Sequence, residues 1–134
     1  MPYKILIIDD DKIALFLHET VIADCGASCT PETFTSAESA LSYLNESLSS
    51  PGQYLIFLDV NMPGIDGWAF SEVIKNHPLR EQITVVMVSS SVEQKDIERA
   101  RSSEVISKYL IKPLREEQVL MLQQDTKLAA FFLA

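Results

Sequence analysis

Five short runs of β-branched and aliphatic residues recur along the chain, separated by stretches with apolar residues at helical spacing. The runs cover residues 4–8, 33–35, 54–58, 83–88 and 105–111, the second being the weakest. Each run has the length of a buried strand, and the segments between them are long enough for a helix and its connecting loops. This alternation predicts repeated βαβ units, and therefore an α/β fold with a parallel sheet covered by helices.

Apolar side chains in the intervening segments repeat at intervals of three and four residues, which predicts helices with one apolar face each. The predicted stripes are Ile13, Phe16, Leu17 and Val21; Ala37, Ala40, Leu41 and Leu44; and Phe70, Val73, Ile74 and His77. A fourth helix, over 92–103, is largely polar and is expected to be held least firmly. The last begins after Leu114, and its apolar tail, 129–134, is expected either to dock or to lead into a longer protein.

The totals favour one domain over residues 1–134, since 134 residues bury one core but not two comfortable ones. No apolar run approaches the length of a membrane span and no leader is evident, so we expect a cytoplasmic protein without a membrane partner. A net charge of -8 argues against direct binding of nucleic acid, which is itself an anion. Cys25 and Cys29 are expected to be free thiols.

Polar side chains stand at the carboxyl ends of the predicted strands, where ligands bind in open α/β sheets. The first strand leads into Asp9, Asp10 and Asp11, the third into Asp59, the fourth into Ser89 and the fifth into Lys112. Clustered carboxylates repel one another, so a divalent cation is expected among them, and Mg²⁺ suits oxygen ligands beside a phosphoryl group. An aspartate can itself form an acyl phosphate, and Asp59 is the best candidate because it stands alone at its strand end.

The same segments resemble the response-regulator receiver family in order along nearly the whole chain. The most specific parts are the sequence Asp59-Val60-Asn61-Met62-Pro63-Gly64-Ile65-Asp66-Gly67 after an apolar strand and Lys112-Pro113 after a later one. The resemblance implies a doubly wound, flavodoxin-like (βα)5 fold with strand order 2-1-3-4-5. It also implies a phosphoacceptor in a two-component system or phosphorelay, rather than a conventional enzyme.

The resemblance assigns roles around the acceptor. Asp59 matches the aspartate that takes a phosphoryl group from a histidine kinase or a histidine phosphotransfer protein. Asp10 matches the acidic residue that binds Mg²⁺ directly, Asp9 its neighbour that acts directly or through water, and Asn61 the position whose backbone carbonyl coordinates the metal. Asn61 and Ser91 match two positions that tune hydrolysis of the aspartyl phosphate.

A second group matches the residues that respond to phosphorylation. Lys112 corresponds to the lysine that pairs with the phosphoryl group, Ser89 to the switch hydroxyl, and Tyr109 to the aromatic side chain that moves with it. The resemblance implies that this movement changes binding to a downstream protein, whose identity the sequence leaves open.

Other interpretations remain at this point. Asp9 to Asp11 could be only helix-capping acids, and Asp11 is expected to be a cap. A haloacid-dehalogenase-like phosphatase would use Asp9 as nucleophile, but its second acidic pair is missing, because Glu116 and Glu117 fall in a predicted helix. An FMN carrier is disfavoured, because the carboxylates in its phosphate-binding loop would repel the phosphate of FMN. A pseudo-receiver that only binds partners would keep the fold without the chemistry.

Overall fold

The computed structural model describes residues 2–49 and 52–132 and contains one parallel sheet of five strands. Their order is β2-β1-β3-β4-β5, which confirms the fold and the strand order that the sequence predicted. The strands are β1 (Tyr3–Ile8), β2 (Glu32–Phe34), β3 (Gln53–Asp59), β4 (Ile83–Ser89) and β5 (Ile106–Ile111). Each lies within about one residue of a predicted run, because buried parallel strands are nearly continuous apolar segments.

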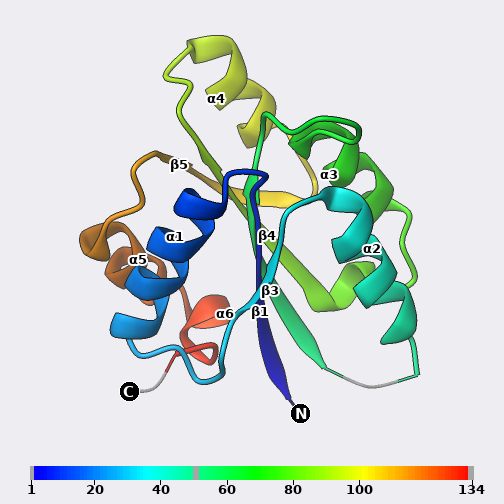
Figure 1. Ribbon diagram of the computed structural model, residues 1–134, viewed down its shortest axis with the longest axis horizontal. Helices are drawn as coiled ribbons and strands as arrows, with labels where there is room; N and C mark the ends of the chain where they lie inside the picture. The colour runs from blue at the N-terminus through cyan, green and yellow to red at the C-terminus, as the bar shows by residue number, and fades with distance from the viewer. Residues whose placement is uncertain (1, 50–51, 133–134) are drawn as a thin grey trace.

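Helices cover both faces of this sheet, as Figure 1 shows, with α1 and α5 on one side and α2 and α3 on the other. The helices are α1 (Lys12–Asp24), α2 (Ala37–Glu46), α3 (Gly67–Lys75), α4 (Gln94–Arg101), α5 (Glu116–Leu122) and the short α6 (Thr126–Ala129), with a 3-10 turn at Arg80–Gln82. None of the helices within 2–49 and 52–132 is long and apolar enough to cross a membrane.

The side chains of β1 alternate between two hydrophobic cores, one on each face of the sheet. Leu6 and Ile8 join the core beneath α2, α3 and α4, whereas Ile5 and Ile7 join the core beneath α1, α5 and α6. All four are at most 1% exposed. A strand buried on both faces explains why its sequence is apolar throughout, and these cores fix the strand ends on which the site depends.

The prediction for the apolar face of α1 was wrong except at Val21, which is half-buried and packs against the core. Ile13, Phe16 and Leu17 are 72%, 66% and 53% exposed, and the helix buries Leu15, His18 and Ile22 instead. Helix α1 is apolar on more than one side, so spacing alone could not tell which stripe faces the sheet. Its larger side chains are therefore left at the surface, next to the carboxyl ends of the strands.

Elsewhere the predicted faces agree better with the structure. Ala37, Ala40 and Leu44 of α2 are buried, as are Phe70 and Ile74 of α3, but Val73 is 42% exposed.

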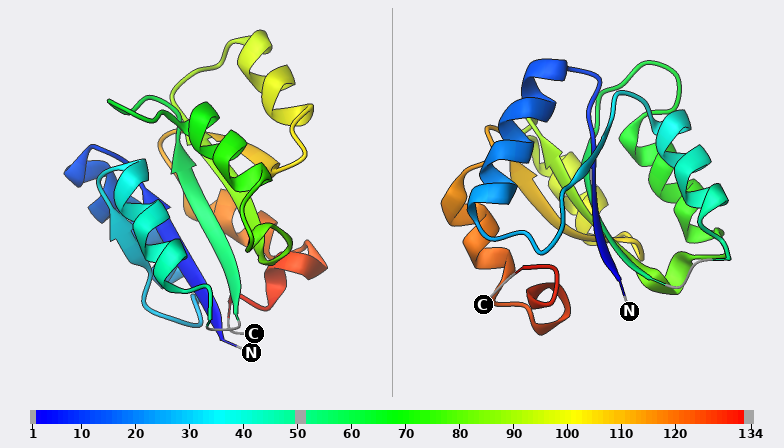
Figure 2. Two further views of the ribbon diagram at one scale, coloured as in Figure 1. Left: turned by 90° about the vertical axis from the view of Figure 1, so that its right-hand side faces the viewer. Right: turned by 60° about the horizontal axis from the view of Figure 1, so that its bottom comes forward.

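The apolar tail docks on its own domain (Figure 2), with Phe131 and Phe132 buried and Ser28 N–H donating to the Phe131 carbonyl at 2.9 Å. Residues 133 and 134 lie outside the described residues. Cys25 and Cys29 are free thiols, as predicted.

Candidate functional site

The carboxyl ends of four strands meet at one edge of the sheet. Ile8 is paired with Leu58, Asp59 with Val88, and Ser89 with Ile111, so each strand stops within about one residue of its neighbour. The register brings the acidic residues after β1, the end of β3, the end of β4 and Lys112 into one region. The predicted convergence of these strand ends is therefore present.

Lys112 lies between two buried carboxylates. Its Nζ donates to Oδ2 of Asp9 at 2.8 Å and to Oδ1 of Asp59 at 3.0 Å. The side chains of Asp9 and Asp59 are 2% and 7% exposed, and that of Lys112 is 23% exposed. The backbone N–H of Lys112 also donates to the Ser89 carbonyl at 2.8 Å, which holds the backbone of Lys112 beside the end of β4.

Burial and charge act in opposite directions on this cluster. Burial raises the pKa of Asp59, the Lys112 hydrogen bond lowers it, and the neighbouring Asp9 charge raises it again, so that the net direction is upward. For Lys112, burial alone would lower the pKa, but its bonds to Asp9 and Asp59 together outweigh burial and raise it. Asp59 is therefore a carboxylate whose charge the protein neutralises only in part.

The three consecutive aspartates do different things. Asp9 Oδ1 accepts the N–H of Asp11 at 2.9 Å, and the Asp11 carboxylate accepts the N–H of Ile13 at 2.9 Å, capping α1. Asp10 is exposed, and its carboxylate takes neither of these roles. The predicted cap at Asp11 is confirmed, so Asp10 remains as the acid of the triplet that is available to an incoming ion.

One carboxylate oxygen from each of Asp9, Asp10 and Asp59 lies within 4.8 Å of the other two, so a single ion could contact all three residues. Such a set of hard oxygen donors suits Mg²⁺, which binds through a few carboxylates and completes its shell with water or phosphate oxygens. The donor set therefore fits the predicted ion. Asn61, whose carbonyl is the other predicted ligand, lies exposed in the β3–α3 loop two residues beyond Asp59.

Ser89 and Tyr109 are connected through one residue of the β4–α4 loop. Ser89 is 1% exposed and its Oγ accepts the N–H of Ser91 at 3.1 Å. The half-buried Tyr109 donates from its hydroxyl to the Ser91 carbonyl at 3.0 Å. The predicted hydroxyl and aromatic residue thus both contact Ser91, which links β4 to β5 above the sheet edge.

Asp66 and Gly67, at the end of the motif that follows β3, begin helix α3. Asp66 caps α3, accepting the Ala69 N–H at 2.8 Å. Gly67 is packed against the backbone of Asp59 and Val60, and its own N–H donates to the Val60 carbonyl at 2.8 Å. A glycine in a strand-to-helix connection is compatible with such a close approach, but the tertiary contact could not be read from sequence.

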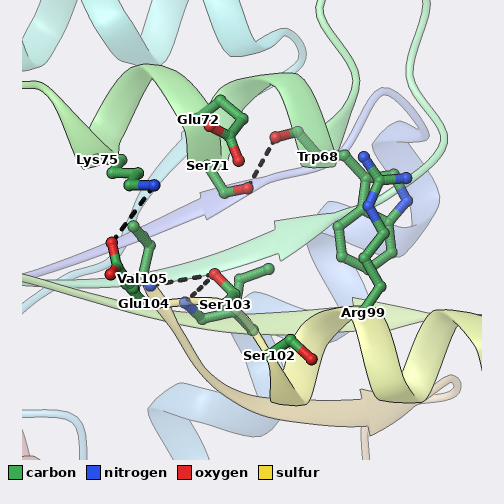
Figure 3. Close-up of a pocket in the computed structure, with 10 residues that line it drawn as sticks. Trp68, Ser71, Glu72, Lys75, Arg99, Ser102, Ser103, Glu104 and Val105 are labelled. Atoms are coloured by element: carbon green, nitrogen blue, oxygen red, sulfur yellow. Dashed lines mark hydrogen bonds and ion pairs between the residues drawn. The ribbon is translucent and has the colours of Figure 1, made fainter.

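A cavity of about 310 Å³ lies between α3 and α4, and none of the predicted site residues lines it. Figure 3 shows Trp68 of α3 facing Arg99 of α4, whose guanidinium lies 4.4 Å from the centre of the indole ring. Lys75 pairs with Glu104 at 3.4 Å on the same wall. These contacts hold α4 against α3, a connection that the sequence did not predict because α4 carries few apolar residues.

Comparison with known proteins agrees with this geometry. The model of the response regulator receiver domain matches residues 5–123. The "Probable methanogenesis regulatory protein FilR2" of Methanothrix harundinacea is 29% identical over 128 residues, which cover 94% of this chain and 82% of that protein. The "Two-component response regulator ORR21" of Oryza sativa subsp. indica is 31% identical over 116 residues, which cover 87% of this chain but 16% of that protein.

Solved structures give the same result. A two-component response regulator from Cytophaga hutchinsonii is 32% identical with a TM-score of 0.83, and the match covers 94% of this chain and 97% of that one. A response regulator receiver protein from Dyadobacter fermentans is 30% identical with a TM-score of 0.80, covering 91% and 96%. The family model matches most of the chain and the fold agrees throughout, so the chain belongs to the family of response-regulator receiver domains.

Proposed function

We propose that the chain, over residues 1–134, is a receiver that accepts a phosphoryl group on Asp59 from a histidine kinase or a histidine phosphotransfer protein. One observation carries the proposal: Lys112 bridges the buried carboxylates of Asp9 and Asp59, beside an exposed Asp10. A structural ion pair would need one carboxylate for one ammonium group. Three carboxylates around one lysine leave an excess of negative charge that suits a cation and a transferable phosphoryl group.

The proposed reaction is an in-line phosphoryl transfer. A carboxylate oxygen of Asp59 attacks the phosphorus of a phosphohistidine, forming a P–O bond while the P–N bond breaks, and the imidazole leaves and takes up a proton. Lys112 would turn from Asp59 toward a phosphoryl oxygen without leaving the site. Water later cleaves the acyl phosphate to give inorganic phosphate and the free carboxylate. The protein acts by positioning and charge neutralisation.

Mg²⁺ is the proposed cofactor, held by Asp10, Asp59 and the Asn61 carbonyl, with Asp9 binding directly or through water. When bound, it would neutralise the phosphoryl oxygens and the acidic side chains together. The excess of carboxylates over ammonium groups supports this assignment. Because Asp9 and Asp59 already share Lys112, the exposed Asp10 is the side chain that an ion can contact with least rearrangement.

The proposed output is a change in the surface around α4. In the structure Ser89 is bonded to its own loop, through Ser91, and Tyr109 is bonded to the same loop. A phosphoryl group on Asp59 would offer Ser89 a charged acceptor, and its movement would release or reposition Tyr109. An unidentified downstream protein would read that difference.

The exposed residues Ile13, Phe16 and Leu17 of α1 support docking of a helical phosphodonor at this edge. An apolar patch on a helix that begins directly after the acidic triplet is placed to seat a partner beside Asp59. A cavity of about 420 Å³ continues this surface toward Lys112, and Leu17 and Leu114 are among its lining residues. A phosphohistidine donor would therefore pack on α1 while its imidazole approaches the carboxylate.

Intact-protein mass spectrometry tests the proposal, with acetyl phosphate as donor in the presence of Mg²⁺. We expect a labile gain of one phosphoryl group, about 80 Da for the reaction described, that disappears in Asp59→Asn and when the metal is chelated. No gain in the wild-type protein would favour the pseudo-receiver. A gain that survives Asp59→Asn would move the nucleophile elsewhere, with Asp9 the first candidate under the phosphatase alternative.

A second assay separates docking from chemistry. Phe16→Ala should slow transfer from a phosphorylated histidine phosphotransfer protein but leave the rate with acetyl phosphate unchanged, because the small donor needs no docking surface. Leu48→Ala is a matched control, since Leu48 is 50% exposed beyond the end of α2. Equal loss with both donors would show that Phe16 affects the site itself.

A further inference from the structure

Ser91 makes hydrogen bonds in four directions. Its N–H donates to Ser89 Oγ at 3.1 Å, and its carbonyl accepts from the Tyr109 hydroxyl at 3.0 Å. Its own hydroxyl donates to Oδ2 of Asp96 at 2.6 Å and accepts the Glu93 N–H at 3.2 Å. One loop residue therefore contacts the proposed switch hydroxyl, the proposed switch aromatic residue and helix α4.

The bond to Asp96 is the short one of these four, and it is assisted by charge, since a hydroxyl donates to a carboxylate. Asp96 is in the first turn of α4 and is half-buried. It contacts neither Asp59 nor a predicted metal ligand in the hydrogen bonds of the described residues. Its connection to the site runs through Ser91 alone among these bonds.

We infer that Asp96 is a positioning residue for the switch hydroxyl: by anchoring Ser91 to α4, it holds Ser89 in the arrangement that goes with an unphosphorylated Asp59. This inference rests on the proposed function and adds a regulatory element to it. Asp96 is not one of the residues predicted from the sequence, and it acts on Ser89 through the loop.

The direction of the effect follows from the geometry. Ser89 Oγ is bonded to the N–H of Ser91 rather than to Asp59. Ser89 only accepts in this bond, so its O–H is free to donate, but no hydrogen bond joins it to Asp59 among the described residues. To reach a phosphoryl oxygen on Asp59, Ser89 Oγ therefore moves away from the Ser91 N–H or draws the loop along with it. The Ser91–Asp96 bond resists movement of the loop, because the loop must then break the bond or carry the start of α4. Asp96 should therefore favour the resting state.

Helix α4 is well placed to oppose such a movement. It is fixed to the rest of the molecule by the buried Ala100 and by the stacking of Arg99 on Trp68 (Figure 3). A loop anchored to Asp96 is thus anchored to α3 as well. The competing explanation is local: Ser91 could merely start the helix, because the N-cap residue Glu93 makes no capping bond with its side chain.

Binding of beryllofluoride, a stable phosphoryl mimic, distinguishes these explanations. We would titrate the whole chain with beryllofluoride in the presence of Mg²⁺ and determine the fraction of bound protein from its ¹H–¹⁵N amide peaks. Asp96→Ala should bind roughly three- to tenfold tighter than wild type, the size of a modest coupling between two sites. Asp96→Asn should fall between them, because a neutral acceptor retains a weaker bond to Ser91.

Two controls make the result specific. Glu98→Gln removes the same charge from α4, where the carboxylate accepts from Gln94 at 3.3 Å within the helix, and should leave the affinity unchanged. The second is a double-mutant cycle: in a Ser89→Ala background, Asp96→Ala should no longer change the affinity, since the hydroxyl through which it acts is absent.

Each outcome has one meaning. If wild type does not bind beryllofluoride at all, or binds it equally well as Asp59→Asn, the proposed function fails. If wild type binds but Asp96→Ala has the same or weaker affinity, the inference fails while the function stands. A change that persists in the Ser89→Ala background assigns Asp96 to the helix start only and also overturns the inference. Amide spectra of each variant show whether the fold is retained.

Discussion

Gly67 lies against the carbonyl oxygen of Asp59 so closely that a side chain at this position would overlap it. A Cβ on Gly67 would also meet the Cα of Val60 at 2.9 Å, within a stretch held by the bond from Gly67 N–H to the Val60 carbonyl. Both obstacles are backbone, which cannot turn aside as a flexible side chain would. The start of α3 is therefore packed directly on the strand end that carries the proposed acceptor.

Gly67→Ala should for this reason destabilise the protein and disturb the site together. Overpacking of this kind costs about 1 to 3 kcal/mol of unfolding free energy, measurable by urea denaturation. Gly52→Ala is the control, because a Cβ there would meet the Pro2 carbonyl at a less severe 3.3 Å. Equal stability of the two variants would contradict the close approach described for Gly67.

Lys112→Met should lower stability at neutral pH, because it leaves the buried Asp9 and Asp59 without their shared cation. Breaking a buried pair costs several kcal/mol; with Lys112 partly exposed, we expect roughly 2 to 4 kcal/mol. Met retains the length of the aliphatic stem, so packing changes little. Urea unfolding at pH 7.5 measures the loss.

The pH dependence of this loss has a definite sign. The pKa of Asp59 is already raised by burial, and removing Lys112 removes a contact that lowers it. A carboxyl group with a raised folded pKa favours the folded state at low pH and loses that contribution as pH rises through the folded pKa. The gap between Lys112→Met and wild type should therefore widen from pH 4.5 to 7.5 and shrink in the Asp59→Asn background. A gap independent of pH would indicate a packing effect.

If the proposed site holds Mg²⁺, the ion should stabilise the folded chain against heat, because the acidic cluster is assembled only in the native state. At a concentration 100 times the dissociation constant, the gain is about 2.7 kcal/mol. Asp10→Asn should abolish this gain in stability. Without metal the variant should be as stable as wild type, because Asp10 is exposed and makes no bond to Lys112. Asp24→Asn is the control, since it removes the same charge from the exposed end of α1. Equal Mg²⁺ stabilisation of the Asp10→Asn variant would exclude Asp10 as a ligand.

The sequence predicted the sheet well because buried parallel strands leave a direct pattern: continuous apolar runs that end in polar residues. It failed for α1, where Ile13 and Leu15 point to nearly opposite sides of the helix but are similarly apolar, and only packing against the sheet decides between them. The sequence could place Asp9, Asp59 and Lys112 together because the carboxyl ends of adjacent parallel strands lie at one edge of a sheet. The Ser91–Asp96 bond depends on the local path of a loop, for which a run of serines gives no signal.

His77 should make stability fall in mild acid. Its Nδ1 accepts the Leu79 N–H at 3.1 Å and its Nε2 lies 2.8 Å from Oδ1 of Asn45, an arrangement that requires the neutral ring with the proton on Nε2. Burial lowers the pKa of His77 below its usual range. As pH falls below about 6.5, the unfolded chain takes up a proton that the folded chain does not, so stability declines.

The variant His77→Gln should reduce that decline, because glutamine can donate to Asn45 without titrating. One proton contributes at most about 1.4 kcal/mol per pH unit, and urea midpoints at pH 7.5, 6.5 and 5.5 give the slope. His18, the other histidine, also has a pKa lowered by burial, so part of the slope should remain. An unchanged slope in His77→Gln would show that this ring does not titrate in the window.

Arg99→Ala should loosen α4 without unfolding the domain. The guanidinium lies over the indole of Trp68, the single tryptophan of the chain, so fluorescence reports this contact directly. A partly exposed cation–π pair is worth roughly 0.5 to 1 kcal/mol, and Ala100 is the one buried residue of α4. We expect a changed Trp68 emission spectrum and faster amide exchange confined to α4. Arg101→Ala, at an exposed site two residues further along α4, should change neither; equal effects of both variants would assign the result to helix charge rather than to stacking.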